Sequence, residues 1–151
     1  AKAGAAVIAC DILKVVAAIA LASLISPDVS IWTGLAAAIG HCYPIFAGFK
    51  GGKAVATMFG FLLATSIFTF QNAWYLIIPL AAFLLLLVLF KMVSLASMAA
   101  ALCSSIFISV MQMDQLQIII ASWLMTILVI YRHRSNIVKI KNGQENKVSW
   151  L

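Results

Sequence analysis

Residues 40–57 read GHCYPIFAGFKGGKAVAT, and they separate two long apolar runs of the 151-residue sequence. The stretch sets several glycines and two lysines, Lys50 and Lys53, where one apolar run ends and the next begins. Flexible backbone and concentrated positive charge between apolar segments are typical of a loop at a membrane boundary. The rest of the chain can be divided around this loop.

The composition is that of a membrane protein. Hydrophobic residues make up 65% of the sequence and charged residues 9%, and the mean hydropathy is +1.13, which is too apolar for an ordinary soluble domain. A helix needs about 20 residues to cross the hydrocarbon core. Six apolar runs approach this length, at approximately 5–25, 31–47, 54–70, 73–90, 93–111 and 115–131. Their short connections predict an all-α, polytopic integral membrane helical bundle with about six transmembrane helices, in which residues 1–151 form a single membrane-embedded domain.

The charges alternate along this division. If the chain enters from the cytoplasm, the acidic loop residues Asp28 and Asp114 lie outside, and every loop lysine or arginine lies inside. The positive-inside rule then predicts a multi-pass membrane protein with both chain ends cytoplasmic. The formal net charge of +6 is explained by this topology and by contact with membrane lipids, so we expect no nucleic acid partner.

The loop at 40–57 also predicts a phosphate site. Backbone N–H groups of a glycine-rich turn can converge on an anion, and a helix beginning near Ala54 would add its positive dipole end. Lys50 and Lys53 would supply ammonium groups. A nucleotide P-loop is excluded because only three residues separate Gly48 from Gly52, and Ala54 follows the lysine. The alternative is a basic inside-facing loop that only orients the membrane spans.

Other polar residues have two interpretations each. Asp11 and Lys14 share a helix face, either as a self-contained ion pair or as a border of the site. Ser94 and Ser97 open the fifth run and could cap its helix or donate to phosphate. His41 could be a general base, an orienting group or a structural residue. With four carboxylates in the chain and no metal-ligand spacing among its three cysteines, we predict neither a metal nor a cofactor.

The whole pattern Gly-His-x-x-Pro-x-Phe-x-x-Phe-Lys-Gly-Gly-Lys-x-Val-Ala-Thr resembles the signature of the bacterial acyl-phosphate:glycerol-3-phosphate acyltransferases, the PlsY family. Further stretches resemble the same family: Asp-x-x-Lys at 11–14, Ser-Leu-Ala-Ser at 94–97, Arg-His-x-x-Asn-Ile at 132–137 and Gly-x-Glu-x-Lys at 143–147. The family normally carries an additional N-terminal span and a first conserved loop. Because this sequence starts after that loop, we expect it to be N-terminally incomplete relative to the family or an unusually short relative.

The resemblance implies transfer of a fatty acyl group from acyl phosphate to the 1-hydroxyl of glycerol 3-phosphate, giving 1-acylglycerol 3-phosphate for phospholipid synthesis. It implies catalytic or orienting roles for His41, His133, Asn136 and Glu145. For binding of substrate phosphate the candidates are Gly48, Lys50, Gly51, Gly52, Lys53, Thr57, Ser94 and Ser97. The resemblance also implies a location in the bacterial inner membrane, with the active-site loops and the C-terminus on the cytoplasmic side.

No Ser-His-Asp arrangement follows from the spacing, and a His-x4-Asp motif is absent because Phe46 and Val138 follow the two histidines at that distance. We therefore hypothesise that a phosphate oxygen of the substrate accepts the hydroxyl proton. Two other classes stay open at this point. One is a transporter or channel for an anionic solute, and the other is a non-enzymatic membrane subunit that uses its basic face for lipid or partner binding.

Overall fold

The computed structural model describes residues 2–149, and within that range it contains helices and no strands. The elements are α1 (Lys2–Ser23), α2 (Pro27–Cys42), the short 3-10 helix η1 (Ile45–Ala47), α3 (Val55–Phe68), α4 (Trp74–Phe90), α5 (Val93–Met111), α6 (Leu116–Arg132) and α7 (Arg134–Lys141). The predicted all-α fold is confirmed. Helix α7 was not predicted, because its sequence reads as a polybasic tail rather than as an apolar run.

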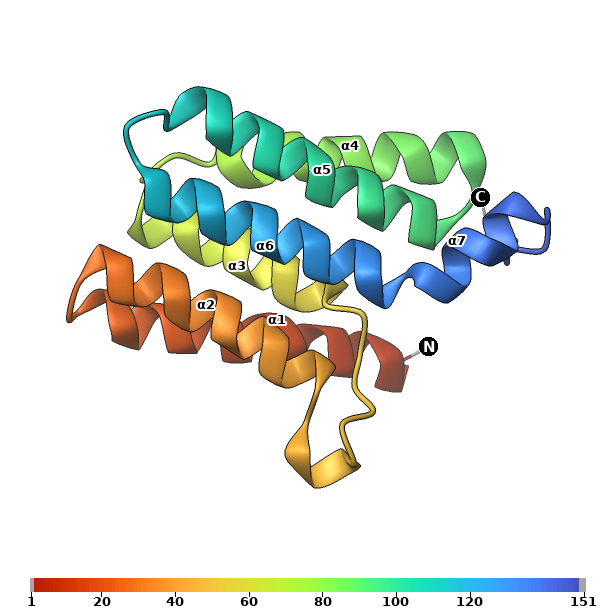
Figure 1. The fold of residues 1–151 in the computed structure, drawn as a ribbon, viewed down its shortest axis with the longest axis horizontal. Helices are drawn as coiled ribbons and strands as arrows, with labels where there is room; N and C mark the ends of the chain where they lie inside the picture. The colour runs from red at the N-terminus through yellow and green to blue at the C-terminus, as the bar shows by residue number, and fades with distance from the viewer. Residues whose placement is uncertain (1, 150–151) are drawn as a thin grey trace.

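Helices α1 to α6 lie alongside one another and run alternately up and down the bundle (Figure 1). Helix α1 packs on α2 and α3, α4 packs on α3 and α5, and α6 packs on α5 and α2. The loop after α2, the turn after α4 and the start of α7 therefore share one end of the bundle (Figure 1). That end carries Lys53, Lys91 and Arg132, whereas Asp28, in the first turn of α2, and Asp114, in the connection before α6, lie at the other end.

Some helices differ in length from the predicted runs, whereas α5 has the predicted bounds 93–111. Within the described residues, three segments are long and apolar enough to cross a membrane, namely Gly4–Ser23, Pro27–Ala47 and Val93–Met111. Helices α6 and α7 meet the same criteria only as a pair bent by 58°. Helices α3 and α4 are apolar but have 14 and 17 residues, or about 21 and 25 Å at the helical rise. The predicted runs were longer because they included loop residues at 54 and 69–70.

Small residues and hydroxyls join α5 to α6. Ala100, Ala101 and Ala121 are fully buried, and small side chains of this kind let membrane helices approach closely. Between the two helices, the hydroxyl oxygens of Ser105 and Thr126 are 2.7 Å apart, and Thr126 Oγ1 donates to the Ala101 carbonyl at 2.8 Å. The end of α6 is thereby fixed relative to the start of α5, and both elements contribute to the site described next.

Candidate active site

The glycine-rich loop folds back against the C-terminal end of α2. The Gly51 N–H donates to the Cys42 carbonyl at 3.1 Å, and the Gly52 N–H donates to the His41 carbonyl at 3.2 Å. A Cβ atom at Gly51 would lie 2.0 Å from the His41 carbonyl oxygen, and one at Gly52 would lie 2.1 Å from His41 Nε2. Gly51 therefore requires glycine because a Cβ would clash with the backbone of α2, whereas a Cβ at Gly52 would clash with the side chain of His41.

These contacts change the role expected for the glycine backbone. The N–H groups of Gly51 and Gly52 are bonded to α2, and the Gly48 N–H donates to the Ile45 carbonyl at 3.3 Å. In this conformation the three N–H groups hold the loop together and do not converge on an open anion site. Direct phosphate binding by these glycines remains a prediction, and the structure gives them a second task, which is to position Lys53.

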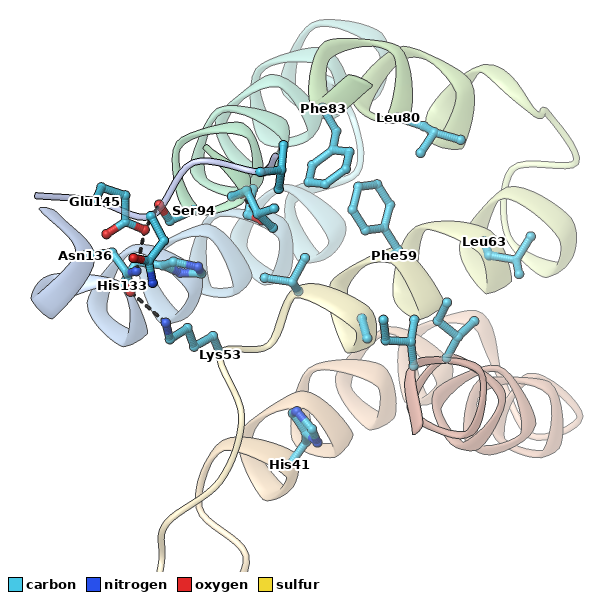
Figure 2. A pocket seen from close by; sticks show the side chains of 18 of the residues that line it. His41, Lys53, Phe59, Leu63, Leu80, Phe83, Ser94, His133, Asn136 and Glu145 are labelled. Carbon is cyan, nitrogen blue, oxygen red and sulfur yellow. Dashed lines mark hydrogen bonds between the residues drawn. The ribbon is translucent and has the colours of Figure 1, made fainter. Parts of the chain in front are cut away.

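A pocket of about 800 Å³ lies beside Lys53 and is polar at one end and apolar at the other (Figure 2). Its predicted site residues come from five separate segments of the chain: His41, Lys53, Ser94, Ser97, His133, Asn136 and Glu145. Its apolar part lies between α3 and α4 and includes Phe59, Leu63, Leu76, Leu80 and Phe83. A charged end joined to an apolar groove suits a ligand that has both a phosphate and an alkyl chain.

A chain of hydrogen bonds links the polar residues. Lys53 Nζ donates to Asn136 Oδ1 at 2.7 Å, and Asn136 Nδ2 donates to Glu145 Oε1 at 2.7 Å. The same carboxylate oxygen accepts from Ser94 Oγ at 2.5 Å. Because Glu145 accepts from the amide nitrogen of Asn136, the amide oxygen faces Lys53. The ammonium group of Lys53 is thereby held in place and keeps two of its three N–H donors for a ligand.

The network shifts the pKa of Glu145. Burial raises the pKa of this carboxyl, but the hydrogen bonds from Ser94 and Asn136 and the charges of Lys139 and Lys53 together bring it below its ordinary value of 4.5. A carboxyl whose pKa is lower in the folded state adds stability above the ordinary value, and that stability is lost as the pH falls through the folded value.

We therefore expect the thermal midpoint of the detergent-solubilised protein to fall on acidification below about pH 4.5, and to fall less steeply in Glu145→Gln. Thermal unfolding of both proteins from pH 6 down to pH 3 measures this. Asp114→Asn, at the other end of the bundle, is the matched control. An identical acid dependence in wild type and Glu145→Gln would contradict the role given to this carboxylate.

The two histidines present different groups to the pocket. His133 is buried, and its Nδ1 lies 2.8 Å from the Val129 carbonyl. Because a carbonyl can only accept, Nδ1 carries the proton, and the Nε2 of the neutral ring has a free lone pair. His41 Nδ1 lies 3.0 Å from Lys14 Nζ. An ammonium can only donate, so with Lys14 donating to Nδ1 the neutral ring carries its proton on Nε2. Asp11 Oδ1 lies 3.4 Å from the same Nδ1. His133 thus offers an acceptor and His41 offers a donor.

The Asp11–Lys14 pair satisfies both interpretations that the sequence left open. Lys14 Nζ donates to Asp11 Oδ1 at 2.6 Å, so the ion pair exists. The same ammonium contacts His41, which lines the main pocket and also a second one of about 550 Å³ with Lys14, Gly51 and Gly52. The pair therefore borders the site and orients one of its rings.

Some predicted site residues lie apart from the main pocket or have their side-chain donor bonded elsewhere. Thr57 is buried and its Oγ1 donates to the Ala54 carbonyl at 3.0 Å. Lys50 is exposed, and neither it nor Gly48 lines the pocket. Ser97 lines the pocket, but its Oγ donates to the Val93 carbonyl at 2.7 Å. Within residues 2–149, no group of three His, Cys, Asp or Glu side chains lies close enough to hold a metal ion.

Arg132 was missed as a site residue. Its Nε donates to the Gly52 carbonyl at 3.0 Å and its Nη2 donates to the Gly51 carbonyl at 2.8 Å. The guanidinium also lies 5.0 Å from the centre of the Tyr43 ring. From the sequence, Arg132 was interpreted as an inside-facing charge and was not assigned to the site, because its partners are 80 and 81 residues away. Only its position next to His133 in the Arg-His motif could have indicated a role.

Comparison with known proteins identifies the family to which this chain belongs. The family model described as "Glycerol-3-phosphate acyltransferase" matches residues 1–143. A glycerol-3-phosphate acyltransferase of Bacillus subtilis (strain 168) is 45% identical over 151 residues, which cover 99% of this chain and 74% of the relative. One of Listeria welshimeri is 44% identical over 154 residues, with the same coverage. This chain belongs to the glycerol-3-phosphate acyltransferase family.

Solved structures of the glycerol-3-phosphate acyltransferase family agree with the fold. PlsY, an integral membrane glycerol 3-phosphate acyltransferase, superposes in its glycerol 3-phosphate form with a TM-score of 0.89 and 32% identity, covering 98% of this chain and 72% of PlsY. Its lysophosphatidic acid form gives a TM-score of 0.88. The predicted integral membrane bundle and the predicted acyl transfer to glycerol 3-phosphate in phospholipid synthesis are confirmed. The transporter and the non-enzymatic subunit are set aside.

Proposed function

We propose that the acyl donor is an acyl phosphate and that the reaction takes place at the polar end of the pocket around Lys53. The observation that carries this proposal is the continuity of one pocket from the Lys53–Asn136–Glu145 network to an apolar groove. An acyl phosphate has a phosphate, a reactive carbonyl and an alkyl chain in that order, which matches the order of surfaces in the pocket. The solved forms of PlsY with glycerol 3-phosphate and with lysophosphatidic acid support a pocket for phosphate-bearing ligands. The second of these ligands carries an acyl chain as well as a phosphate.

The acyl chain, in this proposal, lies between α3 and α4. Ala56, Phe59 and Leu63 line the pocket at helical spacing along α3, and Phe59 meets Phe83 of α4 edge to face with ring centres 5.6 Å apart. From Val55 to Leu63, helix α3 rises about 12 Å. The groove therefore leads away from the charged end along the bundle (Figure 2).

The reaction joins the 1-hydroxyl oxygen of glycerol 3-phosphate to the acyl carbon and breaks the bond from that carbon to the phosphate oxygen. The hydroxyl proton moves to the departing phosphate. Lys53 stabilises phosphate charge, and the N–H of His41 Nε2 supplies a further donor. His133 accepts a hydrogen bond from the neighbouring 2-hydroxyl through its bare Nε2 and so orients the 1-hydroxyl for attack. Because acyl phosphate is an activated anhydride, positioning and charge stabilisation are the main requirements.

His133→Gln tests where the proton goes. If His133 only orients the hydroxyl, we expect kcat to fall about 10- to 100-fold, while the pH–rate profile keeps its shape. Initial rates from pH 5 to pH 9 at saturating substrate measure this, with His41→Gln in parallel. A change from a titrating to a flat profile with binding retained would show that the histidine is the base and would overturn proton transfer to phosphate.

The donor is tested directly with purified protein in detergent. We expect palmitoyl phosphate to acylate labelled glycerol 3-phosphate, and palmitoyl-CoA and palmitoyl-acyl carrier protein to give no product above background. Product is measured as labelled lysophosphatidic acid. Equal turnover with palmitoyl-CoA would contradict the acyl phosphate assignment and leave the family's reaction unaffected.

We also propose that the protein lies in a bacterial inner membrane with its Lys53 end in the cytoplasm, because basic loops concentrate there. Lys50→Cys should then react with a membrane-impermeant maleimide only after cells are opened, and Asp114→Cys should react in intact spheroplasts. The reverse labelling pattern would show that the Lys53 end faces the outside and would contradict this orientation.

A further inference from the structure

We propose that Arg132 is a positioning residue that sets the place of Lys53 by clamping the two glycine carbonyls before it. The proposal rests on the proposed role of Lys53 in phosphate binding. Arg132 does not line the main pocket, so it acts through the loop and not by touching substrate.

The geometry is that of a planar fork holding two consecutive peptide groups. Nε of Arg132 reaches the Gly52 carbonyl at 3.0 Å, and Nη2 reaches the Gly51 carbonyl at 2.8 Å. Charge-assisted hydrogen bonds of this kind are about twice as strong as neutral ones. The guanidinium also stacks over Tyr43, at the C-terminal end of α2. One side chain thus ties the last residue of α6 to the loop and to α2.

The same glycines are held from their other side. Their N–H groups donate to the carbonyls of Cys42 and His41, so both polar groups of Gly51 and of Gly52 have partners. Lys53 is the next residue, and its Nζ must reach Asn136 on α7. Helix α7 starts at Arg134, directly after the α6 segment that ends in Arg132. Arg132 therefore fixes the distance between the base of the Lys53 side chain and the acceptor for its tip.

Lysine cannot replace this arginine. A lysine ammonium is a compact point charge, whereas the guanidinium supplies two parallel donors in a fixed plane. Arg132→Lys keeps the charge at the end of α6 and removes the two-carbonyl clamp. Arg134→Lys is the matched control, since Arg134 is exposed and its guanidinium lies 4.7 Å from the ring of its neighbour Tyr131.

The test is a double-mutant cycle in the acyl transfer assay. We expect Arg132→Lys to lower kcat/KM about tenfold and Arg134→Lys to change it less than twofold. If Arg132 acts through Lys53, adding Arg132→Lys to Lys53→Gln causes little further loss. Independent, multiplicative losses would overturn the proposal. Because Lys53→Gln is measured alone, an unaffected single variant would refute the phosphate role of Lys53 separately from the clamp.

Amide hydrogen exchange gives a readout that does not depend on activity. In Arg132→Lys we expect faster exchange at the amides of Gly51 and Gly52, with exchange in α5 unchanged. Tyr43→Leu, which removes the stacking surface and keeps the arginine, should give an intermediate increase and covers the case in which Arg132→Lys does not fold. Unchanged loop exchange in the folded variants would show that Arg132 does not hold the loop.

Discussion

Lys53→Gln is expected to lower kcat/KM for acyl transfer by about 100-fold or more, the scale of removing one key donor to developing charge. Glutamine retains most of the aliphatic stem and an N–H donor, but it is one bond shorter than lysine, so the 2.7 Å contact with Asn136 Oδ1 weakens. The substitution therefore removes the positive charge and leaves most of the packing intact. Kinetics with glycerol 3-phosphate and palmitoyl phosphate varied in turn would show which phosphate depends on this ammonium.

Lys50→Gln is the matched control for this experiment. Lys50 lies three residues earlier in the same loop and is exposed, as Lys53 is, but Lys50 lies outside the pocket. We expect a less than threefold change, because Lys50 lies outside the pocket and its charge acts on a bound phosphate only through solvent. Equal losses in the two variants would mean that both lysines bind phosphate, as the sequence suggested. No loss at Lys53 would refute the placement of the phosphate site.

The sequence was sufficient for the fold class because hydrophobic length and charge alternation act over short stretches. The six apolar runs became the six long helices, and the basic residues Lys53, Lys91 and Arg132 lie at one end of the bundle. Helix ends were less certain. Helix α2 starts at Pro27, where Ser26 Oγ accepts from the Val29 N–H at 3.1 Å, four residues before the predicted run began.

The sequence predicted which residues belong to the site, but it did not predict the hydrogen bonds between them. Motif matching selected Lys53, Ser94, Asn136 and Glu145, which the structure brings together across up to 83 residues of chain. Nothing local to Asn136 shows that its amide joins a lysine to a carboxylate. The same limit applies to Arg132, since its acceptors are main-chain carbonyls that carry no sequence signal.

The glycine N–H groups show a further limit of local reasoning. A glycine-rich turn between lysines suggests an anion nest, and the loop instead uses these groups to dock on α2. The pattern alone cannot distinguish the two uses, because both need glycine. An anion nest requires the glycine N–H groups, whereas docking on α2 requires the absence of a Cβ. Substitution by alanine distinguishes the two uses, because alanine keeps the N–H and adds a Cβ.

Gly51→Ala is expected to destabilise the protein by about 1–3 kcal/mol, the usual cost of overpacking. Its Cβ would lie 2.0 Å from the His41 carbonyl oxygen, 2.6 Å from Pro44 Cδ and 2.7 Å from the Cys42 carbonyl carbon. Two of these are backbone atoms at the end of a helix, so the loop must move away. That shift would displace Lys53, and a misplacement of about 1 Å can cost about 100-fold in rate. Thermal unfolding and kcat/KM measure the two effects.

Gly52→Ala and Gly40→Ala are the comparison variants, because the contacts expected of an added Cβ differ at the three positions. The Cβ at Gly52 would meet the far end of the His41 ring, whereas nothing lies within 4 Å of one at Gly40. Gly40→Ala, within α2, should be neutral or stabilising by up to about 1 kcal/mol. Adding His41→Ala should recover the stability that Gly52→Ala loses and should not rescue Gly51→Ala, because only the first clash is with a side chain. Equal unfolding temperatures for all three glycine variants would show that close approach to α2 is not the reason for glycine in the loop. Anion binding by the glycine N–H groups would then be the better explanation.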